Sequence, residues 1–211
     1  MPLTIAIVSD VVCPWCFIGT SRLEKALESF PDLDVQVTYL PFLLDPSTPP
    51  EGADLRERLK KKYGGDPEAM FGRVEAAARE TGLALDFSKV RRSVNTLKAH
   101  TLLRHALAKG TQRALAKALF GAYFTDGRDV GDEAVLLELA QAHGFSGPEA
   151  EALLHDAAEL ATTKDEASAM AKQGIDGVPF FILGDHLAVP GAQPVQVFRD
   201  AVERARKELG V

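Results

Sequence analysis

The chain has 211 residues, of which 46% are apolar and 26% are charged, and its formal net charge is −6. Such a composition is typical of one globular domain, or of one domain that carries a large insertion. The mild acidic excess and the lack of any basic block argue against nucleic acid as a partner. No apolar run reaches the ~18 residues of a membrane span, so we expect no membrane association.

The first ten residues contain no basic segment and no small-residue cleavage site, and their apolar stretch leads directly into a cysteine motif. This beginning is not typical of a secretory signal peptide, so we expect a cytoplasmic protein. The only two cysteines are Cys13 and Cys16. A structural disulfide between them would close almost no loop, and the cytosol keeps ordinary thiols reduced. We therefore expect this pair to be reactive.

The N-terminal part is predicted to form a β–α–β unit. Residues 3–8 are nearly all apolar, which is typical of a strand buried on both faces. A helix is expected from the cysteine motif to about residue 30, where Pro31 ends it. Apolar and polar residues then alternate over 35–39, which indicates a second strand.

A long helical block follows a loop rich in proline near residues 44–52. Asp132 suits the N-cap of one of its helices, and Gly110, Gly144 and Gly174 stand where C-terminal caps are expected. The periodicity predicts helices over 54–63, 67–81, 95–109, 112–124, 132–143, 148–156 and 159–173.

Strand character returns at residues 180–183, and Gly184-Asp185 is a hairpin signal before a strand over 186–189. A last helix over 194–209 carries an apolar stripe. The order β–α–β, helices, β–β–α predicts an α/β fold split by one large all-helical insertion. We place the boundaries at 1–45, 46–158 and 159–211, with a substrate cleft expected between the two lobes.

A Cys-x-x-Cys motif that enters a helix has a specific chemical use. Pro14 suits the first helical turn, and Cys13 would sit among free N–H groups at the positive end of the helix dipole, which favours a thiolate. Steps of three and four residues place Cys16 on the inward face with Leu23. We therefore expect an exposed Cys13 as nucleophile and a sheltered Cys16 as the resolving cysteine.

Other interpretations of these residues stay open. A zinc site needs four ligands, and the five histidines show no ligand-like spacing, so we expect no metal and assign no histidine to catalysis. Pro179 is either an ordinary strand-entry proline or a cis-proline that leaves the backbone of Val178 free to pair with an extended peptide. Trp15 is expected to control access to the sulfurs rather than to be a plain surface aromatic.

Two polar residues are weaker candidates for the site. Asp10 is an acid near the buried sulfur or, more simply, a residue that ends a strand. Asn95 is expected first to begin a helix and second to line the cleft.

Residues 9–19, which contain Cys13-Pro14-Trp15-Cys16, resemble the active-site segment of the DsbA family, most closely its FrnE-like branch. Residues 177–182 resemble that family's cis-proline segment, and the motifs at 95–100, 122–129 and 191–194 also look like that branch. The resemblance implies a thioredoxin fold with a helical insertion and a cis-proline at Pro179. It also implies dithiol–disulfide exchange on proteins, peptides or small thiols, with no cofactor besides the redox-active disulfide.

A related branch offers the main alternative. Kappa-class glutathione transferases and 2-hydroxychromene-2-carboxylate isomerases resemble this sequence around Asp10, Pro14, Asn95 and Val178-Pro179. They typically have serine where Cys13 stands, and serine cannot form a mixed disulfide. The cysteine pair therefore argues against their activity, although glutathione remains a candidate co-substrate. A third hypothesis is a chaperone-like module that binds peptides in the cleft without redox chemistry.

Overall fold

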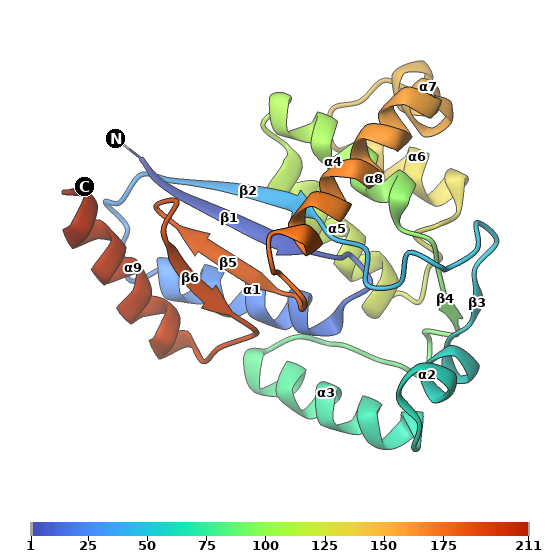
Figure 1. Ribbon diagram of the computed structural model, residues 1–211, viewed down its shortest axis with the longest axis horizontal. Coiled ribbons are helices and arrows are strands. Elements are labelled where there is room, and N and C mark those ends of the chain that lie inside the picture. Colours follow the sequence, from blue (N-terminus) through green and yellow to red (C-terminus); the bar gives the residue numbers. More distant parts are fainter. Residues whose placement is uncertain (1, 211) are drawn as a thin grey trace.

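The computed structural model describes residues 2–210, and its centre is a four-stranded sheet in the order β2–β1–β5–β6 (Figure 1). The parallel pair is β1 (Leu3–Ser9) and β2 (Val35–Pro41), and the antiparallel strands are β5 (Phe180–Leu183) and β6 (Leu187–Pro190). Apolar β1 lies between β2 and β5, which fits its nearly continuous apolar sequence. All four predicted strands are confirmed.

Two helices accompany this sheet. Helix α1 (Pro14–Leu27) packs against α9 (Val195–Leu209), and α9 also contacts β1, β5 and β6. Phe198 of α9 meets Phe181 of β5 edge to face, with ring centroids 4.7 Å apart. Helix α1 ends three residues before the predicted residue 30, because residues 28–30 close in turns ahead of Pro31.

The helical block between β2 and β5 is also confirmed, with boundaries shifted by up to two residues. Two short strands, β3 (Ala53–Asp54) and β4 (Arg92–Ser93), pair within it and were not predicted, since two residues are too few to show a period. The helices of the block are α2 (Leu55–Tyr63), α3 (Pro67–Thr81), α4 (Leu97–Ala108), α5 (Gln112–Phe124), α6 (Glu133–Ala142), α7 (Gly147–His155) and α8 (Ala157–Lys172).

Local capping explains several of these boundaries. The carboxylate of Asp132 accepts hydrogen bonds from the N–H groups of Ala134 and Val135, as an N-cap does. Gly110, Gly144 and Gly174 follow helices with φ values of 70°, 90° and 86°, a conformation that glycine adopts without strain.

The helical block wraps the end of the sheet that carries the cysteine motif. Helix α3 contacts α1, whereas α4, α5 and α8 contact β2, and Figure 1 shows α3 and α8 on opposite sides of the sheet. Helix α8 contacts both β2 and α4, so it joins the sheet to the block. The boundaries at residues 45 and 158 remain predictions. No helix within residues 2–210 has both the length and the apolar character needed to cross a membrane.

The outer edge of β2 is closed by a side chain rather than by another strand. The buried amide of Gln112 accepts from the N–H of Tyr39 at 2.8 Å and donates to the C=O of Tyr39 at 3.0 Å. Gln112 is the first residue of α5, so this double hydrogen bond attaches the helical block to the sheet. It also covers an edge that would otherwise offer unpaired backbone groups.

Candidate active site

The cysteine motif spans the start of α1. Cys13 is the extended N-cap residue, and its C=O accepts hydrogen bonds from the N–H groups of Cys16 at 3.0 Å and Phe17 at 3.2 Å. Its own N–H donates to the C=O of Asp10 at 2.9 Å. Pro14 occupies the first helical position, where its missing N–H costs nothing. Backbone bonds thus fix both cysteines, which are free thiols here.

Cys16 lies on the inward face of α1, as its spacing predicts, and is completely buried. Burial raises the pKa of the Cys16 thiol well above its ordinary value, and the hydrogen bond with Cys13 and the charges of Cys13 and Asp10 act in the same direction. Cys16 is therefore a thiol at neutral pH. Such a group becomes reactive only when its proton is removed during the reaction.

The prediction that Cys13 is exposed is wrong, because only 3% of its surface is accessible. Its Sγ lies 3.6 Å from the C=O of Val178 and faces a cleft of about 450 Å³. Side chains of α2, α3 and α5 line this cleft together with Cys13, so the start of α1 lies inside the fold rather than at an open surface. They are Leu55, Leu59, Tyr63, Met70, Phe71, Val74, Tyr123 and Phe124.

The second predicted segment lies directly beside the first. The Val178–Pro179 peptide bond is cis, and Val178 lines the cleft next to Cys13. Helix α1 approaches this segment closely at Gly19, where a Cβ would stand 3.0 Å from Cγ of Pro179. The structure thus brings together Cys13, Pro14, Trp15 and Val178 at one cleft.

The walls of the cleft are largely apolar. Trp15 lines the cleft with 40% of its surface exposed, so it is both an accessible aromatic and part of the opening. Behind it, Phe17 stacks on Phe120 and Phe124 with centroid distances of 5.2 and 6.1 Å. These contacts join α1 to α5. Phe124 also lines the cleft, so this aromatic cluster borders the space that Cys13 faces.

Asp10 occupies the turn between β1 and the motif and is buried. Its Oδ2 accepts from the N–H of Leu44 at 2.8 Å, and its Oδ1 lies 3.2 Å from Nε2 of His100. Sequence reasoning left His100 without a role, because nothing in the local pattern connects it to a residue ninety positions earlier. Its only signal was its place in the segment 95–100 that resembles the DsbA family.

Asn95 is not among the side chains that line the cleft. Its Oδ1 accepts from the N–H of Leu97 at 3.0 Å, and its Nδ2 donates to the C=O of Thr48 at 2.8 Å. It therefore begins α4 and holds the loop after β2. Within residues 2–210, no three His, Cys, Asp or Glu side chains are grouped as a metal site would require.

The protein-family model for the DSBA-like thioredoxin domain matches residues 4–203 of the chain. The chain belongs to this family. The predicted thioredoxin fold with inserted helices is thereby confirmed. The uncharacterized protein YwbO of Bacillus subtilis (strain 168) is 29% identical over 99% of this chain and 100% of its own length.

Solved structures of DsbA-like proteins and their relatives agree with this assignment. A probable DsbA oxidoreductase from Streptomyces coelicolor is 36% identical, with a TM-score of 0.88 over 98% of this chain and 91% of its own. A 2-hydroxychromene-2-carboxylate isomerase (16% identity, TM-score 0.75, 98% of both chains) shares the fold. The cytosolic disulfide reductase DsbM from Pseudomonas aeruginosa, solved with GSH, also shares the fold. Its sequence identity is 19% and its TM-score 0.63, over 99% of this chain and 100% of DsbM.

Proposed function

We propose that this DsbA-like protein is a FrnE-like thiol–disulfide oxidoreductase in which Cys13 and Cys16 form the redox pair. One observation carries the proposal: Cys13 opens onto an apolar cleft beside Val178, while Cys16 is buried one helical turn further along α1. Only Cys13 is positioned to contact a substrate disulfide, and only Cys16 is positioned to displace the substrate from Cys13. The substrates are disulfides or thiols of proteins, peptides or small molecules.

The exchange proceeds in two displacements when the substrate is a disulfide. The thiolate of Cys13 attacks one substrate sulfur, so a Cys13–substrate bond forms, the substrate S–S bond breaks, and the departing sulfur takes a proton from water. Cys16 then loses its proton to water and attacks the sulfur of Cys13, so the Cys13–Cys16 bond forms and the Cys13–substrate bond breaks. The second substrate sulfur leaves as a thiolate and takes a proton from water. The substrate gains two electrons and two protons, and the enzyme is left as the Cys13–Cys16 disulfide. The reverse sequence oxidises a dithiol.

The surrounding residues support this chemistry by position. Pro14 leaves no N–H to be satisfied at the helix start, and Trp15 offers an apolar surface at the opening of the cleft. The backbone of Val178, held before Pro179, lies where an extended peptide would pass Cys13. An apolar cleft with one backbone strip suits a peptide that carries apolar side chains.

The glutathione-dependent isomerase or transferase remains the second candidate, because the fold is shared with an isomerase of this type. The Cys13–Cys16 pair is the feature that argues against it. A cytoplasmic location and glutathione as a co-substrate are supported by the likeness to DsbM, a cytosolic disulfide reductase solved with GSH. In the cytosol, reduction or isomerisation of disulfides is easier than net oxidation.

The first experiment is to measure the reduction potential of the Cys13–Cys16 pair in glutathione buffers over a wide ratio. A value of about −270 mV indicates a reductase or isomerase, and one of about −120 mV an oxidant. If no internal disulfide forms at any ratio, the proposal is wrong. In parallel, Cys13→Ser should abolish exchange, whereas glutathione conjugation that survives this change would support the isomerase or transferase.

The peptide-binding hypothesis needs a separate control. A variant with both cysteines changed to alanine should lose all disulfide exchange. If the protein acts only as a chaperone-like module, this variant will suppress the aggregation of an unfolded protein as well as the wild type does. Wild-type exchange with model disulfides, absent in the double variant, would instead support the redox function.

A further inference from the structure

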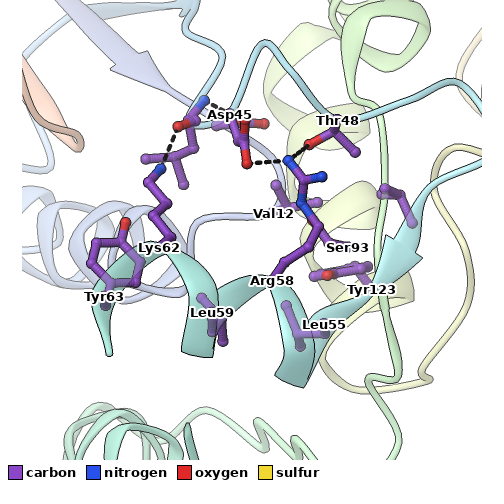
Figure 2. Close-up of a pocket in the computed structure, with 13 residues that line it drawn as sticks. Val12, Asp45, Thr48, Leu55, Arg58, Leu59, Lys62, Tyr63, Ser93 and Tyr123 are labelled. Carbon is purple, nitrogen blue, oxygen red and sulfur yellow. Dashed lines mark hydrogen bonds and ion pairs between the residues drawn. The ribbon is translucent and has the colours of Figure 1, made fainter. Parts of the chain in front are cut away.

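A small pocket that has both apolar and charged side chains in its wall lies on one side of the cysteine cleft, and Figure 2 shows the side chains that line it. Its volume is about 90 Å³. The pocket and the cleft are adjacent, since they share Val12, Leu44, Leu55, Leu59, Tyr63 and Tyr123 as lining residues. A molecule whose sulfur contacts Cys13 and which continues along this shared wall reaches the pocket.

Two cationic side chains project from α2 into the pocket, one helical turn apart. The guanidinium of Arg58 is paired with the carboxylate of Asp45 and also donates to Oγ1 of Thr48 at 3.2 Å (Figure 2). Burial acts to raise the pKa of Asp45, but hydrogen bonds from Ser47 and Arg58 outweigh it and lower that pKa. Asp45 is therefore ionised at neutral pH, and it compensates the charge of Arg58.

Lys62 is the uncompensated cation of the pocket. Its Nζ donates to the C=O of Leu44 at 2.8 Å and lies 5.3 Å from the centroid of the Tyr63 ring. No carboxylate of residues 2–210 lies within ion-pair distance of this ammonium. An ammonium group has three N–H donors, so two stay available to a ligand. The remaining acid of the pocket, Asp10, is occupied by Leu44 and His100.

We infer that the pocket receives a carboxylate of the reacting thiol or disulfide, and that Lys62 makes the enzyme prefer acidic substrates. This inference rests on the proposed function. Arg58 also lines the pocket, and its Nε is buried without a partner among the described residues. Asp176, on the cleft wall, adds a negative charge that would repel an acidic group placed there, which favours the Lys62 side.

The test compares Lys62→Gln with Lys61→Gln. Lys61 is the adjacent residue of α2, is exposed and lines neither pocket, so its replacement changes the net charge equally. Single-turnover rates are measured for the reduced enzymes with oxidised glutathione, which is acidic, and with hydroxyethyl disulfide, which is uncharged. We expect Lys62→Gln to slow the reaction with oxidised glutathione about three- to fivefold relative to Lys61→Gln. The rate with hydroxyethyl disulfide should be the same in both variants.

Added salt should reduce the difference, because it screens partly exposed charges. Equal rates of the two variants with oxidised glutathione would overturn the inference, as would an equal slowing of Lys62→Gln with both disulfides. The outcome for the proposed function is read separately. A wild-type enzyme that reacts with neither disulfide would contradict exchange itself, whereas normal exchange with no charge preference would contradict only the carboxylate pocket.

Discussion

Nε2 of His100 lies 3.2 Å from Oδ1 of Asp10, and both side chains are only 2% exposed. The pair joins α4 to the turn between β1 and the cysteine motif, and it lies beneath the active site. A buried carboxylate is costly unless it is paired and hydrogen-bonded, and here His100 and the N–H of Leu44 supply that pairing. The helical block therefore contributes directly to the stability of the segment that carries Cys13.

Removing the imidazole should leave Oδ1 of the buried Asp10 without its partner, while Oδ2 keeps the N–H of Leu44. We predict that His100→Leu lowers the free energy of unfolding by about 3 kcal/mol, as measured by urea denaturation of the reduced protein. The control is His105→Leu on the same helix, since His105 pairs with Glu159 but is about one-third exposed. That change should cost no more than about 1 kcal/mol. Equal losses of unfolding free energy in the two variants would show that the buried Asp10–His100 pair stabilises the protein no more than an exposed pair does.

The raised pKa of Cys16 predicts a pH dependence of stability. The folded protein keeps the Cys16 proton at pH values where the unfolded chain, with an ordinary thiol pKa of 9.0, has released it. The stability that depends on the protonated Cys16 thiol is fully present below about pH 9. It is lost as the pH rises from there through the raised pKa of the folded protein, at up to about 1.4 kcal/mol per pH unit. Stability of the reduced protein should therefore fall above pH 9.

Cys16→Ala is the reference for this effect, because it lacks the titrating group. Urea denaturation in excess reductant should show a steeper fall for the wild type than for Cys16→Ala between about pH 9 and 10. Burial also raises the pKa of Tyr39 and Tyr123, so these two groups also lower the stability of the folded protein as the pH rises. Their effect begins only above the ordinary tyrosine pKa of 10.0. Parallel curves for the two proteins in this window would contradict the buried-thiol assignment.

The sequence predicted the features whose causes are local. The periodicity of α1 placed Cys16 inward, and the glycines and Asp132 marked helix ends, because these depend on residues a few positions apart. The segment resemblance located Val178-Pro179 beside Cys13. In each case, neighbouring residues or a known motif carried the information.

The features that escaped prediction depend on distant residues. Cys13 was expected to be exposed because a lone helix start is open to water, but it is only 3% exposed and lies in a cleft that side chains of α2, α3 and α5 also line. The pairing of Asp10 with His100 and the hydrogen bonds between Tyr39 and Gln112 connect positions 90 and 73 residues apart. No periodicity within one element reports such contacts, so only the folded chain shows them.

The hydrogen bonds of Gln112 give a further prediction. Gln112→Leu has a similar volume but leaves the buried N–H and C=O of Tyr39 without partners, so we expect a loss of about 2 kcal/mol in unfolding free energy. Arg113→Ala, at the exposed neighbouring position, removes only a surface ion pair with Glu24 and should cost no more than about 1 kcal/mol. Hydrogen exchange of the Tyr39 amide should accelerate only in Gln112→Leu. Unchanged exchange there would mean that the side chain does not close the edge of β2.

Gly19 and Gly121 form a matched pair for the last prediction, since both lie inside helices. A Cβ at Gly19 would stand 3.0 Å from Cγ of Pro179 and 3.3 Å from the Cα of Ala192, whereas nothing lies within 4 Å of a Cβ at Gly121. Backbone cannot yield as a flexible side chain does, so Gly19→Ala should destabilise by about 1–3 kcal/mol despite its better helix propensity. Gly121→Ala should instead stabilise by up to about 1 kcal/mol.

The two alanine variants should also differ in activity. Pressure on Pro179 would displace Val178 from Cys13, so Gly19→Ala should slow exchange with a peptide disulfide, while Gly121→Ala keeps the wild-type rate. The measurement is the single-turnover rate at a temperature where both variants are fully folded by circular dichroism. A Gly19→Ala protein that is as stable and as fast as Gly121→Ala would show that α1 and the Val178–Pro179 segment do not need this close approach.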